Sequence, residues 1–166
     1  LTSGKEAFSA GADLTMLQHG AKDYARVLKE EGEEAAMTFF FENARRGSLV
    51  FRKLETCGKP WAAAINGLAL GGGFEIALAC HYRVISDSPK AAVGLPEVKV
   101  GLFPGAGGTQ RVPRLTDTQA ALQMLTSGQT LTPAKAKAMN LITAVAPADR
   151  LVEAAKDLIK GGLKPV

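Results

Sequence analysis

Residues 59–80 read KPWAAAINGLALGGGFEIALAC, and this stretch decides how the rest of the chain can be interpreted. The apolar run before Asn66-Gly67 is typical of a buried strand that ends in a turn. The triple glycine that follows leads into Glu75 and an apolar segment, which predicts a helix over residues 73–82. Glycine lets backbone N–H groups come close to a ligand, and a carboxylate in apolar surroundings is suited to proton transfer.

A membrane-spanning helix is an alternative for residues 61–80, because this mostly apolar stretch has the length of about 20 residues that crosses a bilayer. Gly67 and Gly71 have the small-xxx-small spacing of contacts between membrane helices. However, Asn66, Glu75 and the consecutive glycines would each weaken a helix exposed to lipid. We therefore expect no membrane insertion.

A second glycine cluster, Pro104-Gly105-Ala106-Gly107-Gly108-Thr109-Gln110-Arg111, follows a second acidic motif, Leu95-Pro96-Glu97. Two carboxylates, each close to a glycine cluster, indicate acid–base chemistry on a substrate that forms an oxyanion. Neither cluster fits the dinucleotide-binding pattern G-x-G-x-x-G, because Ile76 and Gln110 stand where the last glycine would be.

Structural roles for the two glutamates stay open on these residues alone. Glu75 in the first turn of a helix would also complement the helix dipole. Glu97 follows Pro96 and fits an ordinary helix start, and taken by itself it favours that structural role.

The composition describes an ordinary domain with enough residues for one core, with 166 residues, 46% of them hydrophobic and 22% charged. A net charge of +4 suits a substrate with nucleotide phosphates, but a solvated surface equally well. Cys57 and Cys80 lack zinc or redox spacing and no signal peptide is evident, so the cytoplasm is the expected location and no metal site is expected. Aromatic residues are not interleaved with arginines, which argues against a nucleic-acid partner. His19 and His81 receive no role.

The predicted elements alternate short strands with helices, which indicates one α/β domain. Leu1-Thr2-Ser3 resembles the end of a strand, a loop at Gly11 follows, and residues 18–34 form a polar region. Thr132 as a cap and Pro133 at the first helical position support a helix there. The remaining predictions are helices at 35–54, 73–82, 109–114, 117–126, 133–139 and 151–159, and strands at 61–65, 84–86, 91–93 and 141–145.

Several motifs in one order carry a family resemblance: Ala7-Phe8-Ser9-Ala10-Gly11-Ala12-Asp13-Leu14, residues 59–67 with the triple glycine, Gly94-Leu95-Pro96-Glu97, and residues 104–111. Together they resemble the enoyl-CoA hydratase (crotonase) family over nearly the whole chain. The resemblance implies a crotonase (ClpP/crotonase-like) fold, a right-handed spiral of ββα units with stacked sheets. It also implies that residues 1–166 are a partial domain, incomplete at both ends, with no second domain.

The resemblance implies roles for particular residues. The backbone N–H groups of Ala12 and Gly72 would hold the thioester oxygen of acyl-CoA as an oxyanion. Glu75 and Glu97 would hold a water molecule between them and pass its proton to the α-carbon, with Gly105 positioning that water. The three residues expected to contact the substrate are Ala10, Asp13 and Leu14.

The presence of both glutamates favours reversible hydration of a 2-trans-enoyl-CoA to a 3-hydroxyacyl-CoA, because related isomerases and hydrolases often lack one of them. The alternatives are a Δ3–Δ2-enoyl-CoA isomerase and a non-catalytic domain used for assembly or RNA binding. The acyl-CoA thioester is the expected substrate, and no cofactor is expected in this domain.

Finer details look most like the hydratase/isomerase region of bacterial multifunctional fatty-acid oxidation proteins. They are His81-Tyr82-Arg83-Val84, a longer connection at residues 86–90, and the tail at residues 160–165. We therefore expect a following 3-hydroxyacyl-CoA dehydrogenase region that uses NAD, and either a homo-oligomer or association with other β-oxidation enzymes.

Overall fold

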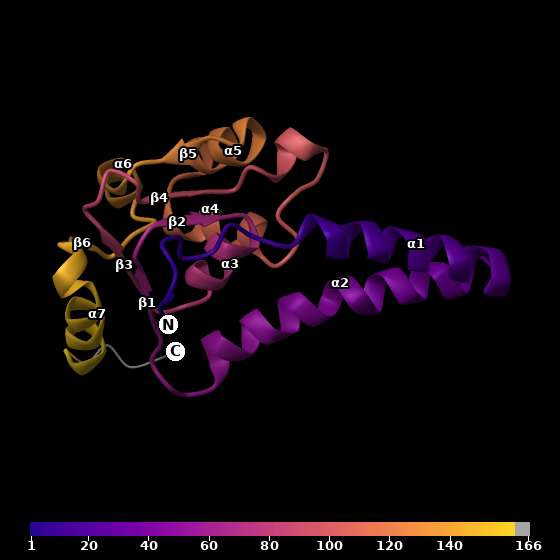
Figure 1. The fold of residues 1–166 in the computed structure, drawn as a ribbon, viewed down its shortest axis with the longest axis horizontal. Coiled ribbons are helices and arrows are strands. Elements are labelled where there is room, and N and C mark those ends of the chain that lie inside the picture. The colour runs from indigo at the N-terminus through magenta and orange to yellow at the C-terminus, as the bar shows by residue number, and fades with distance from the viewer. Residues whose placement is uncertain (162–166) are drawn as a thin grey trace.

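The computed structural model describes residues 1–161, apart from the side chains of Leu14 and Leu17. Most of the tail motif at residues 160–165 therefore lies outside the described residues. The body contains two small sheets with helices around them, and a long helical hairpin extends away from it (Figure 1).

The hairpin consists of α1 (Leu14–Glu31) and α2 (Glu33–Thr56), which are joined at Gly32 with φ of 92°. Asp13 caps α1 by accepting a hydrogen bond from Thr15 N–H at 2.8 Å. The polar region at residues 18–34, for which no element was predicted, thus belongs mostly to a helix. A helix that packs against only one neighbour needs few apolar positions, which is why its pattern gave no strong signal.

The stretch at residues 59–80 forms β1 (Ala62–Ile65), β2 (Leu68–Leu70) and α3 (Gly72–Leu78). The predicted strand and turn are confirmed, whereas β2 was not predicted. The helix is shorter than the predicted 73–82, because β3 (Tyr82–Ser86) begins at Tyr82 and pairs with β1.

The six strands of the described residues form two three-stranded sheets, and the chain passes back and forth between them. The first sheet has the order β1-β3-β6, all parallel, with β6 at Ala144–Ala146. The second has the order β2-β4-β5, with β4 (Ala92–Gly94) parallel to β2, and β5 (Thr130–Leu131) antiparallel to β4. Since each pass of the chain adds one strand to each sheet, the path is a spiral.

The remaining helices pack against the two sheets or against one another. They are the 3₁₀ helix η1 (Glu97–Val100), α4 (Gly108–Leu115), α5 (Thr118–Ser127), α6 (Pro133–Ala138), the 3₁₀ helix η2 (Ala148–Arg150) and α7 (Leu151–Lys160). The predicted Thr132 cap is confirmed, since its hydroxyl accepts from Lys135 N–H at 3.4 Å. The predicted strand at 141–145 is shifted to β6, and Leu141 and Ile142 are instead buried core residues.

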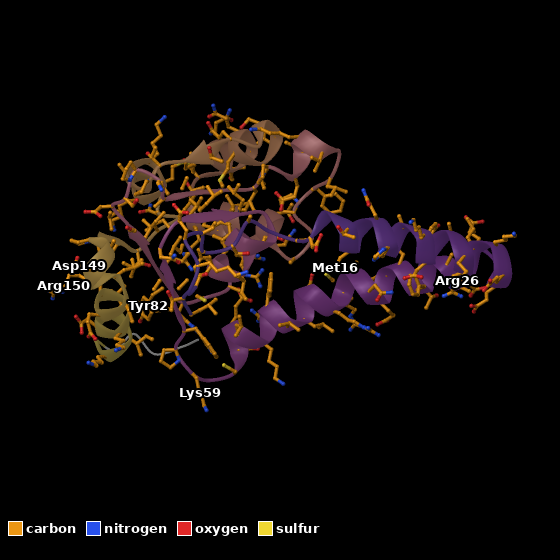
Figure 2. The ribbon with its side chains drawn as sticks, viewed as in Figure 1. Met16, Arg26, Lys59, Tyr82, Asp149 and Arg150 are labelled. Atoms are coloured by element: carbon orange, nitrogen blue, oxygen red, sulfur yellow. The ribbon has the colours of Figure 1, made fainter. Side chains whose placement is uncertain are left out.

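Two apolar clusters form the core. The larger one joins both sheets to α3 and contains Phe74, Ile65, Leu95 and Met124. The smaller one lies between the first sheet and α7 and contains Leu151 and Tyr82, the latter labelled in Figure 2. The predicted strand end at Leu1-Thr2-Ser3 is not a regular strand, although Leu1 exchanges backbone hydrogen bonds with Ala62 and Ala64 of β1.

Candidate active site

The loop before α1 lies against the start of α3, although the two are far apart in sequence. Ser9 N–H donates to Leu68 O at 3.0 Å, and Leu70 N–H donates to Ser9 O at 2.9 Å. Gly73 allows this close approach, because a Cβ there would overlap both the carbonyl and the side chain of Ser9. The first residues of α3 are thereby fixed beside the Gly11 loop.

This contact brings Ala12 and Gly72 together. A Cβ placed on Gly72 would lie 3.9 Å from the nitrogen of Ala12. Gly11, with φ of 103°, turns the chain at this point. Within the described part of the chain neither the Ala12 N–H nor the Gly72 N–H donates to a protein acceptor, so both remain free to bind a ligand.

Glu75 projects from α3 and is 3% exposed. Its Oε1 accepts hydrogen bonds from the backbone N–H groups of Ala106 and Gly108, both at 2.8 Å. Burial raises the pKa of the Glu75 carboxyl, while these two hydrogen bonds and the nearby Arg111 cation oppose the rise. Two backbone N–H groups of the second glycine cluster therefore bind one carboxylate oxygen of a buried glutamate.

Glu97 is the first residue of η1 and is half-buried. Its Oε2 is buried and has no hydrogen-bond partner among the described residues. Its Oε1 faces Gly71, where a Cβ would lie 3.2 Å away. Burial raises the pKa of Glu97 against the effect of its own backbone N–H, and the charge of Glu75 raises it further. Glu97 thus faces the glycine turn from which the helix that holds Glu75 begins.

The other residues predicted for the site, where the structure describes their side chains, are exposed to solvent. Gly105 is exposed, and its carbonyl accepts from Ser48 Oγ at 3.1 Å. Ala10 is exposed, and Asp13 is exposed and serves as the cap of α1. Leu14 begins α1, but its side chain lies outside the described residues.

Sequence reasoning missed the amides of Ala106 and Gly108, which hold Glu75. The glycine-rich sequence of their loop was the signal that could have indicated these donors, because backbone N–H groups are accessible where side chains are small. His81 is structural, because its Nδ1 accepts from Trp61 N–H at 3.1 Å. The described residues contain no group of three or more His, Cys, Asp or Glu side chains that could hold a metal ion. They also contain no helix with the length and apolar character needed to cross a bilayer.

The family model described as enoyl-CoA hydratase/isomerase matches residues 1–163. The chain belongs to the enoyl-CoA hydratase/isomerase family. The fatty acid oxidation complex subunit alpha of Shewanella frigidimarina is 45% identical over 168 residues, and that of Shewanella loihica is 42% identical over 166 residues. These matches cover 99% of this chain, but only 22% and 21% of the two relatives.

Solved structures confirm the predicted crotonase-type α/β fold. DspI of Pseudomonas aeruginosa has a TM-score of 0.77 at 34% identity, over 96% of this chain and 59% of its own. An enoyl-CoA hydratase of Bacillus anthracis has a TM-score of 0.70 at 26% identity, over 94% of this chain and 68% of its own. The family resemblance read from the sequence motifs is likewise confirmed.

Proposed function

We propose that this chain catalyses the reversible hydration of a 2-trans-enoyl-CoA to a 3-hydroxyacyl-CoA in fatty-acid β-oxidation. One observation carries the proposal: Glu97 faces the glycine turn at the start of the helix that holds the buried Glu75. Beside this turn, the N–H groups of Gly72 and Ala12 have no protein acceptor among the described residues. Membership of the family and the names of the relatives support the same reaction.

The thioester oxygen would accept hydrogen bonds from the N–H groups of Ala12 and Gly72. As water adds to the β-carbon, negative charge develops on this oxygen, and donors already in place stabilise it without reorganising. The acyl-CoA thioester supplies the electrophile, so no step requires a cofactor. The residues proposed to bind the substrate are Ala10, Asp13 and Leu14, and Gly105 would help to hold the water.

The two glutamates would take opposite protonation states. Glu75 is the better base, because two backbone N–H groups stabilise its carboxylate form. Glu97 is the better acid, because its buried Oε2 lacks a donor in the described structure. Glu75 takes a proton from water while the water oxygen bonds to the β-carbon, and Glu97 gives a proton to the α-carbon. Transfer of the proton from Glu75 to Glu97 closes the cycle.

The first prediction tests this pair with glutamine substitutions. Glu75→Gln and Glu97→Gln keep the side-chain shape but remove the proton transfer, so hydration should fall by roughly 10²–10⁴-fold while acyl-CoA still binds. Loss of the ultraviolet absorbance of crotonyl-CoA measures the reaction in the full-length protein. Glu153→Gln, at an exposed glutamate of α7, is the matched control.

A double variant, Glu75→Gln with Glu97→Gln, that still hydrated crotonyl-CoA at the parent rate would reject the proposal. A Δ3–Δ2-enoyl-CoA isomerase is the second candidate, favoured by the unpartnered Glu97 oxygen, which suits a single proton shuttle. A 3-enoyl-CoA substrate separates the two activities, since isomerisation would depend on Glu97 but less on Glu75. A non-catalytic assembly domain would show neither activity.

We further propose that the chain is the hydratase/isomerase region of a longer cytoplasmic polypeptide in which a 3-hydroxyacyl-CoA dehydrogenase region uses NAD. The chain matches only about a fifth of its fatty acid oxidation relatives, which supports this reading. Association with itself or with other β-oxidation enzymes belongs to the same proposal. Recovery of the source reading frame tests it, and a stop codon a few dozen codons beyond Val166 would reject it.

A further inference from the structure

The loop at residues 104–108, which binds Glu75, is also bound by a residue of α2. The Ala106 carbonyl accepts from Arg111 Nη1 at 2.9 Å, while the Ala106 N–H donates to Glu75. The neighbouring Gly105 carbonyl accepts from Ser48 Oγ of α2 at 3.1 Å. A single peptide segment thus connects the buried carboxylate to groups outside the site.

Arg111 is anchored by a carboxylate of α2. Its Nε donates to Glu55 Oε1 at 2.6 Å, and its side chain is only 11% exposed. The other oxygen of Glu55 accepts from Arg52 at 2.9 Å, but the Arg52 side chain is 67% exposed. An exposed ion pair such as Arg52–Glu55 contributes little to stability. The shielded Arg111–Glu55 pair, with the additional hydrogen bond from Arg111 to the Ala106 carbonyl, fixes the position of the Arg111 side chain.

Two further observations tie the pair to the loop. Gly107 has φ of 109°, and a Cβ on it would overlap the guanidinium of Arg111, so the loop conformation is fitted to this side chain. Partial burial by itself would raise the pKa of Glu55, but hydrogen bonds from Arg111 and Arg52 bring it below its ordinary value. Glu55 is therefore a persistent anion opposite Arg111.

We propose that the Glu55–Arg111 ion pair is a positioning device for the hydration reaction: it holds the loop at residues 104–108 so that the Ala106 and Gly108 amides keep Glu75 oriented and ionised. The proposal rests on the function proposed above. Neither residue is assigned contact with the substrate. The charge of Arg111 also favours the Glu75 carboxylate directly.

Arg111→Met and Glu55→Gln test the device in the full-length protein. Arg111→Met should lower kcat for hydration roughly 10- to 100-fold with KM changed less than about threefold, because transition-state geometry rather than substrate binding is lost. The acid limb of the pH profile should move to higher pH, since removal of the cation raises the pKa of Glu75. Arg111→Lys should recover part of the rate, because it restores the charge without the fork of donors.

Glu55→Gln should also lower kcat, but by less, and the two losses in kcat should be less than additive when combined. Arg52→Met removes the exposed partner of the same glutamate and is the control expected to leave kcat and the pH profile unchanged. If Arg111→Met does not fold, Glu55→Gln carries the test. A folded Arg111→Met or Glu55→Gln protein with the parent kcat and the parent pH profile would overturn the proposal.

Hydrogen exchange separates this inference from the proposed reaction. Amides at residues 105–110 should exchange at least about tenfold faster in Arg111→Met and Glu55→Gln, but not in Arg52→Met, whether or not the parent hydrates enoyl-CoA. Unchanged exchange would overturn the inference alone. A parent protein without hydratase activity but with this exchange pattern would overturn the proposed function and leave the anchoring of the loop supported.

Discussion

At the residue scale, the site combines two glutamates whose environments differ. Glu75 is buried but has two backbone donors, whereas Glu97 has a buried oxygen without one in the described structure. A buried polar atom without a partner destabilises a fold. Glu97 therefore lowers the stability of the fold, and its proposed role as a proton donor explains why a glutamate stands there.

The second prediction follows from the sign of that cost. Because burial and then the charge of Glu75 raise the pKa of Glu97 above 4.5, the folded state holds the proton more tightly than the unfolded chain. Stability from this group is fully present below about pH 4.5 and is lost as the pH rises through the higher folded pKa. Glu97→Gln should therefore unfold at higher urea than the parent at pH 7, and the difference should shrink towards pH 4.

Urea unfolding of the chain, followed by the fluorescence of its single tryptophan, Trp61, gives this comparison. Gln123→Ala, at an exposed residue of α5 that does not titrate, provides the control, because its effect on stability should be the same at pH 4 and at pH 7. A Glu97→Gln variant less stable than the parent at pH 7 would mean that the carboxylate is better solvated than its burial implies.

At the element scale, α3 is held at both ends. The candidate site lies at its N-terminal end, and a buried arginine of β3 contacts its C-terminal end. Arg83 of β3 is buried and donates to the carbonyls of Ala77, Leu78 and Cys80 at the end of α3, and also to Leu141 O at 2.9 Å. The carbonyls that a helix leaves free at its C-terminus are thereby satisfied. This contact fixes the far end of the helix that positions Gly72 and Glu75.

The third prediction is that Arg83→Met destabilises the chain by roughly 2–4 kcal/mol, since each buried carbonyl left without a donor costs about 1–3 kcal/mol. Arg114→Met is the matched control, because Arg114 also donates to a carbonyl, that of Gln110, but on the exposed surface. Its loss should change stability by less than about 0.5 kcal/mol. Urea unfolding measures both, and equal losses would show that burial of Arg83 is unimportant.

Sequence reasoning placed elements best where local chemistry decides them. Thr132 with Pro133 fixed a helix start, and the apolar run before Asn66-Gly67 fixed a strand. It failed where distant contacts decide: β2 has three residues and exists because β4 pairs with it, and α3 ends early because Tyr82 joins β1. The two glutamates were visible as residue types, but their donors at Ala106 and Gly108 are backbone atoms that the sequence does not distinguish.

At the scale of the whole molecule, the spiral body and the α1–α2 hairpin differ in how they are held. The body has strands buried on both faces, and all five residues of β3 are buried. In the hairpin, Val27 and Ala36 are the buried side chains among those described, and Figure 2 shows α1 extending away from the body from Met16 to Arg26. The site belongs to the body, and α2 contacts its loop through Ser48 and Glu55, towards the C-terminal end of the helix.

The final prediction is a hydrogen-exchange pattern that follows from this difference. Amides of β3 should exchange only through global unfolding, because the strand is central in its sheet and wholly buried. Amides of α1 and of the first half of α2 should exchange at least about 100-fold faster, because the hairpin can open without disturbing the core. The last turns of α2 should resemble the body, since Ser48 and Glu55 tie them to the loop around Glu75. If exchange were instead uniform along α2, the hairpin would unfold together with the body, and the anchoring of the site would extend along the whole helix.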